Sequence, residues 1–236
     1  HFDEFNDVAD HCTICHRCVK PCPVDIDFGD VSVAMRNFLR KQGKKRTSPG
    51  TLAAMTYLNL KDPATIKLMR GVMMDFGFKA QRLAHKAAKA VGLVRETRVH
   101  PPATLGAPSV KTQIIHFMNR PMPGNLPKRT SRALLDIEDD KVIPVIRNPQ
   151  KTTEDSDAVF YFPGCGSERL FSQVGLATQA MLYEIGATTV LPPGYLCCGY
   201  PQTASGDDDK GQKITTDNRV LFHRVANTLN YLDIKT

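Results

Sequence analysis

The sequence lacks several features that would place it in a common class of protein. No run of about 18 apolar residues could span a bilayer, and no charged-then-apolar signal segment stands at the start. Aromatic residues do not interleave with the lysines and arginines, as a stacking platform for nucleic acid requires. There is no G-x-G-x-x-G motif and no phosphate-binding loop. These absences predict a soluble, cytoplasmic protein with no nucleic-acid partner.

The chain contains enough apolar residues to form a core, and it carries an excess of positive charge. Its 236 residues are 42% hydrophobic, which allows one or two domains. The net charge of +7 favours an acidic protein partner or an anionic membrane surface. A peripheral position at the inner face of the membrane is therefore an alternative to a free cytoplasmic one.

Four closely spaced cysteines near the start carry the strongest signal. Cys12, Cys15, Cys18 and Cys22 precede Pro23 with the spacing C-x2-C-x2-C-x3-C-P, which is the bacterial ferredoxin run. Two-residue gaps let a tight loop place three thiolates around one [4Fe–4S] cluster. The fourth cysteine then serves a neighbouring cluster whose own run lies upstream of the chain, or it closes a lone cluster itself. The run predicts these four cysteines as metal ligands.

Structural zinc and disulfides are the alternatives for this run. Zinc sites usually combine two separated pairs of ligands rather than three cysteines in register. Disulfides would be unusual in a chain with seven cysteines and no secretion signal. His11 and His16 flank the run, and we expect them to lie outside the first coordination shell or in solvent.

Three further cysteines lie far along the chain, after two predicted strands. Strands are expected over 157–162 and 187–191, and helices over 170–185 and 214–232, which gives the order β-α-β-α of a parallel sheet. Cys165 follows the first strand, and the pair Cys197 and Cys198 follows the second. Open α/β sheets place their sites at the carboxyl ends of the strands. We therefore expect the three thiols to converge. The alternative is that Cys165 is simply a buried apolar residue and that the adjacent pair is a coincidence.

The remaining sequence predicts helices separated by a connector. Helices are expected over 31–40 and 51–60, and another begins at the N-cap Asp62 and is weakened by Gly71 and Gly77. The stretch 99–150 is rich in proline and is expected to be an extended connector. The predicted fold class is α+β. Its parts are a helical ferredoxin-like domain at 1–98, the connector at 99–150, and an incomplete α/β cysteine-rich module at 151–236.

The two groups of cysteines together resemble a family of iron–sulfur proteins. The family includes the iron–sulfur subunits of glycolate oxidase, the lactate-utilisation iron–sulfur protein, the small subunit of anaerobic glycerol-3-phosphate dehydrogenase, and the C and B subunits of heterodisulfide reductase. Its cysteine-rich module is known for the CCG motif, matched here by Cys197, Cys198 and Gly199 after Cys165. The module's closing C-x2-C would fall just beyond Thr236.

The resemblance implies an oxidoreductase component that transfers electrons. A [4Fe–4S] cluster would bind at Cys12, Cys15, Cys18 and Cys22, and a second cluster at the CCG module. FAD would be held by a missing domain or a partner flavoprotein that oxidises lactate or glycolate, as in bacterial fusions of an FAD-linked oxidase with an iron–sulfur part. The acceptor would be a quinone or another acceptor at a membrane surface. Thiol–disulfide catalysis at a CCG-bound cluster, as in heterodisulfide reductase, is the alternative.

The cysteine run generates a prediction about metal content. Protein prepared without oxygen should show an oxygen-sensitive [4Fe–4S] chromophore, because this spacing has few other uses. Iron and acid-labile sulfide analysis provides the measurement. Stoichiometric zinc without sulfide would contradict the prediction.

Overall fold

The protein is described by a computed structural model, which covers residues 2–45, 47, 49–94, 114 and 117–232. The chain is helical with one small sheet, so the predicted α+β class is confirmed. It divides into two compact units. The first comprises His1–Thr51, Met74–Gly124 and Tyr200–Gln212, and the second comprises Leu52–Met73, Asn125–Gly199 and Lys213–Thr236. The boundaries expected near residues 98 and 150 stay a prediction.

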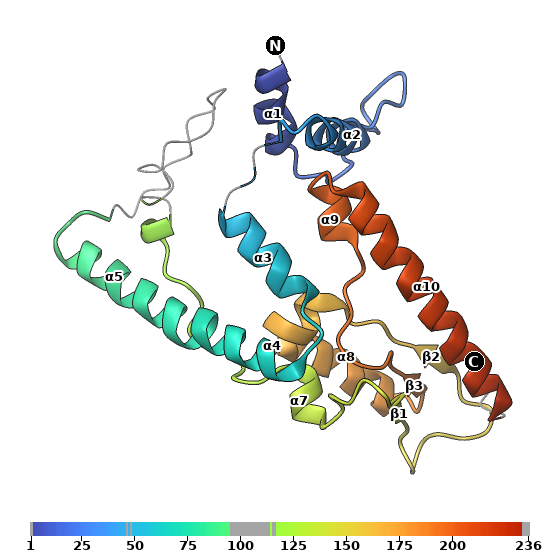
Figure 1. Cartoon of the computed structure of the whole chain (residues 1–236). Helices are drawn as coiled ribbons and strands as arrows, with labels where there is room; N and C mark the ends of the chain where they lie inside the picture. Colours follow the sequence, from blue (N-terminus) through green and yellow to red (C-terminus); the bar gives the residue numbers. More distant parts are fainter. Residues whose placement is uncertain (1, 46, 48, 95–113, 115–116, 233–236) are drawn as a thin grey trace. The chain divides into compact units, whose positions relative to one another are not determined.

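The first unit contains the helices that flank the cysteine run. Helix α1 (Phe2–His11) packs against α2 (Phe28–Lys41), and α2 also contacts α9 (Tyr200–Ala204) (Figure 1). The helix predicted over 31–40 is confirmed, but it begins three residues earlier. The reason is Asp27, whose carboxylate accepts the N–H of Gly29 at 2.7 Å and thereby caps the first turn.

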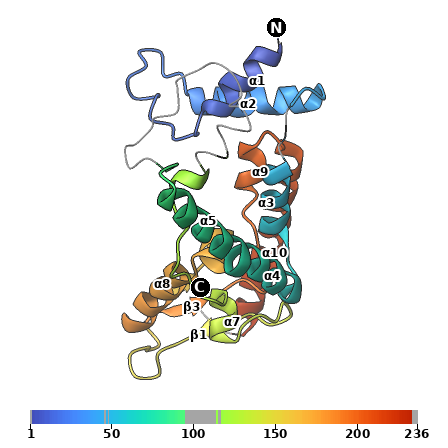
Figure 2. The ribbon, with the colours of Figure 1, turned by 90° about the vertical axis from the view of Figure 1, so that its left-hand side faces the viewer.

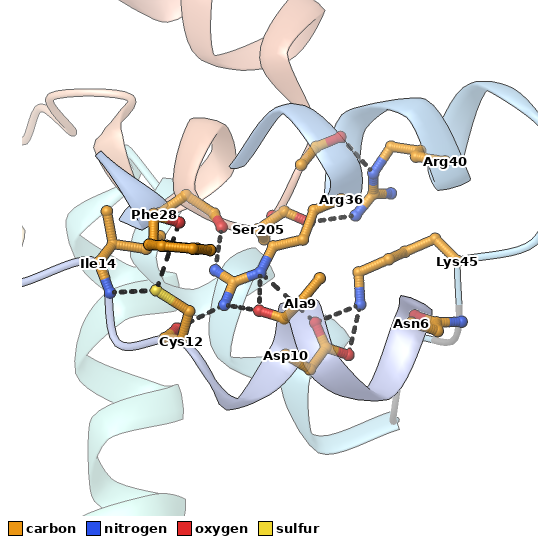
Figure 3. A network of polar contacts seen from close by, with 12 residues as sticks. Asn6, Ala9, Asp10, Cys12, Ile14, Phe28, Arg36, Arg40, Lys45 and Ser205 are labelled. Carbon is orange, nitrogen blue, oxygen red and sulfur yellow. Dashed lines mark hydrogen bonds and ion pairs between the residues drawn. The ribbon is translucent and has the colours of Figure 1, made fainter. Parts of the chain in front are cut away.

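Arg36 holds these elements together from the middle of α2 (Figure 3). Its side chain is buried, and its Nε and Nη2 donate to the carbonyl oxygen of Ala9 at 3.1 and 2.6 Å. Nη2 also donates to the carbonyl of Cys12 at 2.5 Å, and Nη1 donates to the carbonyl of Ala204 at 2.6 Å. Gly206 must be glycine here, because its φ is +83° and a Cβ would lie 2.5 Å from the carbonyl carbon of Arg36. One guanidinium therefore fixes the end of α1 and the first cysteine of the run.

The helices that follow confirm the expected start at Asp62. Helix α3 spans Pro49–Asn59, and α4 spans Pro63–Arg70 with the Asp62 carboxylate accepting the N–H of Thr65 at 2.7 Å. The glycines expected to weaken this helix coincide with a change of helical type. A π-helix, η1, runs over Gly71–Gly77, and α5 follows over Phe78–Ala90.

The second unit contains the sheet predicted for the cysteine-rich part. Strand β2 (Ala158–Phe160) pairs in parallel with β3 (Thr188–Val190), and α8 (Ser172–Glu184) packs on β3 as the crossover helix (Figure 2). Helix α10 (Asp208–Tyr231) follows β3 and contributes Val225 and Leu229 to a core with Val190. The predicted order β-α-β-α is confirmed.

The expected connector contains secondary structure that its proline content concealed. Helix α7 spans Ser131–Leu135. Thr130 is its N-cap residue, whose hydroxyl accepts a hydrogen bond from the N–H of Ala133. Strand β1 (Val145–Ile146) joins the sheet antiparallel to β3, giving the order β1-β3-β2. A wholly extended connector is therefore wrong for the described part of this stretch, because Ser131–Leu135 form a helix. Residues 99–113 of the connector lie outside the described residues.

Charged side chains are buried in the second unit near the sheet. Arg132 and Glu168 are 1% and 2% exposed, and the Nε of Arg132 lies 2.5 Å from Oε1 of Glu168. Burial raises the pKa of Glu168 to about 6, although the Arg132 charge acts in the opposite direction. In the described part of the chain, no helix has the length and hydropathy needed to cross a membrane.

This buried ion pair generates a prediction about stability. Arg132→Leu should lower the free energy of unfolding by about 3–5 kcal/mol, because Glu168 would remain buried without its charged partner. The pair Lys151–Glu184 has the same 2.5 Å separation but is about half exposed, so it provides a control. Lys151→Ala should cost less than about 1 kcal/mol. Equal losses for the two variants in denaturant unfolding would contradict the prediction.

Candidate iron–sulfur sites

The ferredoxin run forms the loop between α1 and α2, and backbone N–H groups point at its sulfur atoms. The N–H of Ile14 donates to Cys12 Sγ at 3.4 Å, that of Phe28 to Cys18 Sγ at 3.3 Å, and that of Ile26 to Cys22 Sγ at 3.3 Å. The pKa of Cys15 is lowered mainly by its hydrogen bond with the backbone of Arg17. Each of the four thiols is thus provided with a backbone donor, which would stabilise a thiolate ligand.

The loop achieves this arrangement through backbone conformations that few residues adopt. Ile14, His16 and Asp25 have φ values of 54°, 57° and 53°, in the left-handed region. Each turns the chain sharply, so that short segments between cysteines can direct their N–H groups inward. Arg36 fixes the start of the loop through the carbonyl of Cys12 (Figure 3).

The histidine within the run lies beside an acidic side chain rather than among the cysteines. His16 is exposed, and its Nδ1 lies 2.5 Å from Oδ2 of Asp27. This hydrogen bond raises the pKa of His16. With Asp30, these side chains form a cluster of oxygen and nitrogen atoms within 4.8 Å of one another. No sequence pattern indicates this contact between residues 16 and 27.

The second group of cysteines converges at the carboxyl ends of β2 and β3. Cys165 precedes η2 (Gly166–Leu170), and the pair Cys197 and Cys198 precedes α9. The thiols of Cys165 and Cys197 form a hydrogen bond with each other. This bond lowers the pKa of Cys197 and raises the pKa of Cys165, so the pair readily holds one negative charge. The crossover therefore brings the distant cysteines together as expected from the topology.

Helix α10 holds the cysteine pair by its backbone. Asn218 Nδ2 donates to the carbonyl of Cys197 at 2.7 Å, and Thr215 Oγ1 donates to that of Cys198 at 3.3 Å. Cys197 is buried at 6% exposure, whereas Cys198 is exposed. The backbone is therefore anchored while the Cys198 side chain stays accessible.

A pocket of about 650 Å³ opens beside Cys198 in the second unit. Phe222 lines it together with Phe160 and Phe162, with ring centroids 4.9 and 5.6 Å away. Thr215, Asn218, Arg219 and His223, which carry polar groups, also line it. A pocket of this size with a few polar groups is typical of a site for a small organic molecule.

The donor sets suit iron–sulfur clusters. Both groups offer soft thiolates, which favour iron–sulfur and zinc. Backbone N–H groups reach the four sulfurs of the first group, and that of Gly199 reaches Cys197 in the second. Among the described residues, no three cysteine sulfurs lie within 4.8 Å of one another. A tetrahedral zinc ion would bring its sulfur ligands to roughly 3.8 Å from each other. The assignment of all seven cysteines as ligands stays a prediction.

Comparison with known proteins shows what parts of this chain are similar to. Residues 159–228 match the family model of a cysteine-rich domain called CCG, so the second group of cysteines belongs to such a domain. The chain is also similar to the "Probable glycolate oxidase iron-sulfur subunit" of Bacillus subtilis (strain 168), with 23% identity over 219 residues. Both findings agree with the resemblance of the cysteine spacing to the iron–sulfur CCG family of glycolate oxidase subunits.

The extent of that similarity is limited to part of the relative. The match covers 89% of this chain and 41% of the Bacillus protein, so the chain spans about two fifths of the relative's length. No solved structure matches the chain significantly.

The N–H···S bonds of the run generate a prediction about reduction potential. Phe28 is the first residue of α2, where proline is tolerated, and Asp27 before it already has an extended backbone. Phe28→Pro should therefore keep α2 and remove only the donor to Cys18 Sγ. The lost hydrogen bond of about 1 kcal/mol would lower a one-electron potential by roughly 40 mV.

Phe28→Ala is the matched control, because it shortens the same exposed side chain and keeps the N–H. Circular dichroism should show equal helix content in both variants. Equal potentials in a redox titration of the two proteins would contradict a ligand role for Cys18.

Proposed function

We propose that the chain is an iron–sulfur electron-transfer module of an oxidoreductase. It would receive electrons from a flavin-linked dehydrogenase for a 2-hydroxy acid such as lactate or glycolate, and pass them to a quinone or another acceptor. The observation that carries the proposal is the set of backbone N–H groups directed at the four sulfurs of the ferredoxin run. The similarity to a glycolate oxidase iron–sulfur subunit supports the same proposal.

The chain's own cysteines would hold two clusters in this module. Cys12, Cys15 and Cys18 would hold one [4Fe–4S] cluster, with Cys22 either closing it or serving a neighbouring one. Cys165, Cys197 and Cys198 would contribute to a second. When bound, such clusters supply one-electron steps between a two-electron flavin and the acceptor.

The remaining residues position these ligands. The donors at Ile14, Ile26 and Phe28 would stabilise the negative charge on the ligand sulfurs. Arg36 fixes the loop against α1, and Asn218 fixes the CCG backbone against α10. Rigid ligands of this kind limit the reorganisation that accompanies a change of charge.

A second function is favoured by the exposed Cys198 at the wall of the pocket. Thiol–disulfide chemistry would need an accessible sulfur beside a space for the substrate, and this site offers both. Under that hypothesis an organic disulfide would be reduced to two thiols by two electrons from the module and two protons. Turnover of disulfides that is abolished by Cys198→Ser would favour this function over simple electron transfer.

The proposed function is tested with the full-length protein and its flavoprotein partner under anaerobic conditions. Adding lactate or glycolate should bleach the cluster absorbance and produce the paramagnetic signal of reduced clusters. Cys15→Ser should lose iron and sulfide from the ferredoxin run and abolish this reduction. Lys20→Ser, at an exposed position of the same loop, should behave as the unchanged protein.

Cys22→Ser separates the two alternatives for the fourth cysteine. Loss of a neighbouring cluster alone would assign Cys22 to that cluster, whereas loss of the cluster at Cys12 would assign it to the lone one. If the protein contains its full complement of clusters and neither lactate nor glycolate reduces them, the proposed electron donor is contradicted.

A further inference from the structure

Arg169 is a buried cation beside the CCG cysteines that has donors left over. Its side chain is 0% exposed, and Nη1 donates to the carbonyl oxygens of Tyr57, at 3.0 Å, and Leu58. Within the described parts of the chain, Nε and Nη2 have no hydrogen-bond partner. The guanidinium is therefore held at one corner while two of its nitrogen atoms remain unsatisfied.

An arrangement of this kind is costly in a folded protein. A buried donor without a partner has lost its hydrogen bonds with water and gained none in return, and this loss of stability is larger when the donor is charged. The charge of the adjacent Glu168 carboxylate acts on Arg169, but this carboxylate makes no hydrogen bond with Nε or Nη2 of Arg169, and its Oε1 accepts from Nε of Arg132 at 2.5 Å. Buried charges in proteins are normally paired or bound to a metal centre. The unsatisfied nitrogen atoms thus indicate a group that these contacts do not include.

The position of Arg169 identifies where that group would lie. Arg169 lies in η2, four residues after Cys165, which precedes this helix and already has a helical backbone. Residues four apart in a helical segment lie near the same face. Its positive charge acts on the sulfurs of both Cys165 and Cys197. On another side the guanidinium carbon lies 5.6 Å from the centre of the Tyr195 ring. Nη1 is already bound to carbonyl oxygens, and the Tyr195 ring offers no anionic acceptor. The cysteine site is therefore the place where an anionic acceptor for Nε and Nη2 would lie.

We infer that Arg169 is a positioning residue whose Nε and Nη2 donate to the sulfur atoms of a cluster held by Cys165 and Cys197. The inference rests on the proposed second cluster. Thiolates and sulfides give such a cluster negative charge, which one added electron increases. A buried cation with N–H donors toward sulfur therefore stabilises the reduced form more than the oxidised form, and it raises the reduction potential.

The experiment is a redox titration of the CCG-bound cluster in the full-length holoprotein, monitored by electron paramagnetic resonance. Arg169→Gln should lower the equilibrium constant for one-electron reduction at least tenfold, which corresponds to about 59 mV. Arg169→Lys keeps the charge with fewer directed donors and should recover part of the shift. Arg224→Gln changes the net charge equally at an exposed position of α10 and should leave the potential unchanged.

Iron and sulfide analysis of each protein distinguishes the outcomes. A fully loaded Arg169→Gln protein with the potential of Arg224→Gln would overturn the inference and leave the proposed function intact. A wild-type protein without iron at Cys165 and Cys197 would overturn the proposed second cluster, and the inference with it.

A second measurement covers the case in which Arg169→Gln fails to fold or to load. In wild-type protein labelled with ¹⁵N-arginine, pulsed resonance of the reduced CCG cluster should reveal coupling to a guanidinium nitrogen. Arg169→Lys should abolish that coupling. A loaded wild-type cluster without any such coupling would overturn the inference.

Discussion

Parallel pairing of β2 with β3 is the constraint on which the cysteine-rich site depends. The register joins Ala158 to Thr188 and Phe160 to Val190, so both strands end at the same edge of the sheet. The loops that leave this edge carry Cys165 and the pair Cys197 and Cys198. Their meeting follows from the parallel backbone pairing and the crossover through α8, before any metal contributes. A slip of this register would separate the thiols and remove the site.

Buried arginines give the two groups of cysteines their rigidity. Arg36 donates hydrogen bonds to backbone carbonyls around the ferredoxin run. Arg132 donates to the carboxylate of Glu168 and to the carbonyl of Pro192. Arg169 is arranged differently, because only Nη1 is bound to carbonyls. Arg36 and Arg132 therefore have a structural role, whereas the free donors of Arg169 agree with the proposed role toward a cluster.

Much of the architecture could be predicted because local rules determine it. Asp62 before Pro63 specified the start of α4, and the strand patterns around residues 158 and 188 specified the parallel pair. Strand β1 was missed, because two residues in a proline-rich stretch form a strand only by pairing with β3. The cysteines were apparent from spacing alone. Arg36 and Glu168 were not, because their partners lie far along the sequence; Arg169 could have been found from its four-residue distance to Cys165.

We propose that two separate sets of cysteines, brought together by different parts of the fold, hold iron–sulfur clusters. Anomalous diffraction at the iron absorption edge, from anaerobically grown crystals of the full-length protein, locates iron at each set. Iron peaks are expected beside Cys12, Cys15 and Cys18, and further iron peaks beside Cys165 and Cys197. Peaks at the zinc edge alone, or well-ordered cysteines without metal at both places, would contradict it.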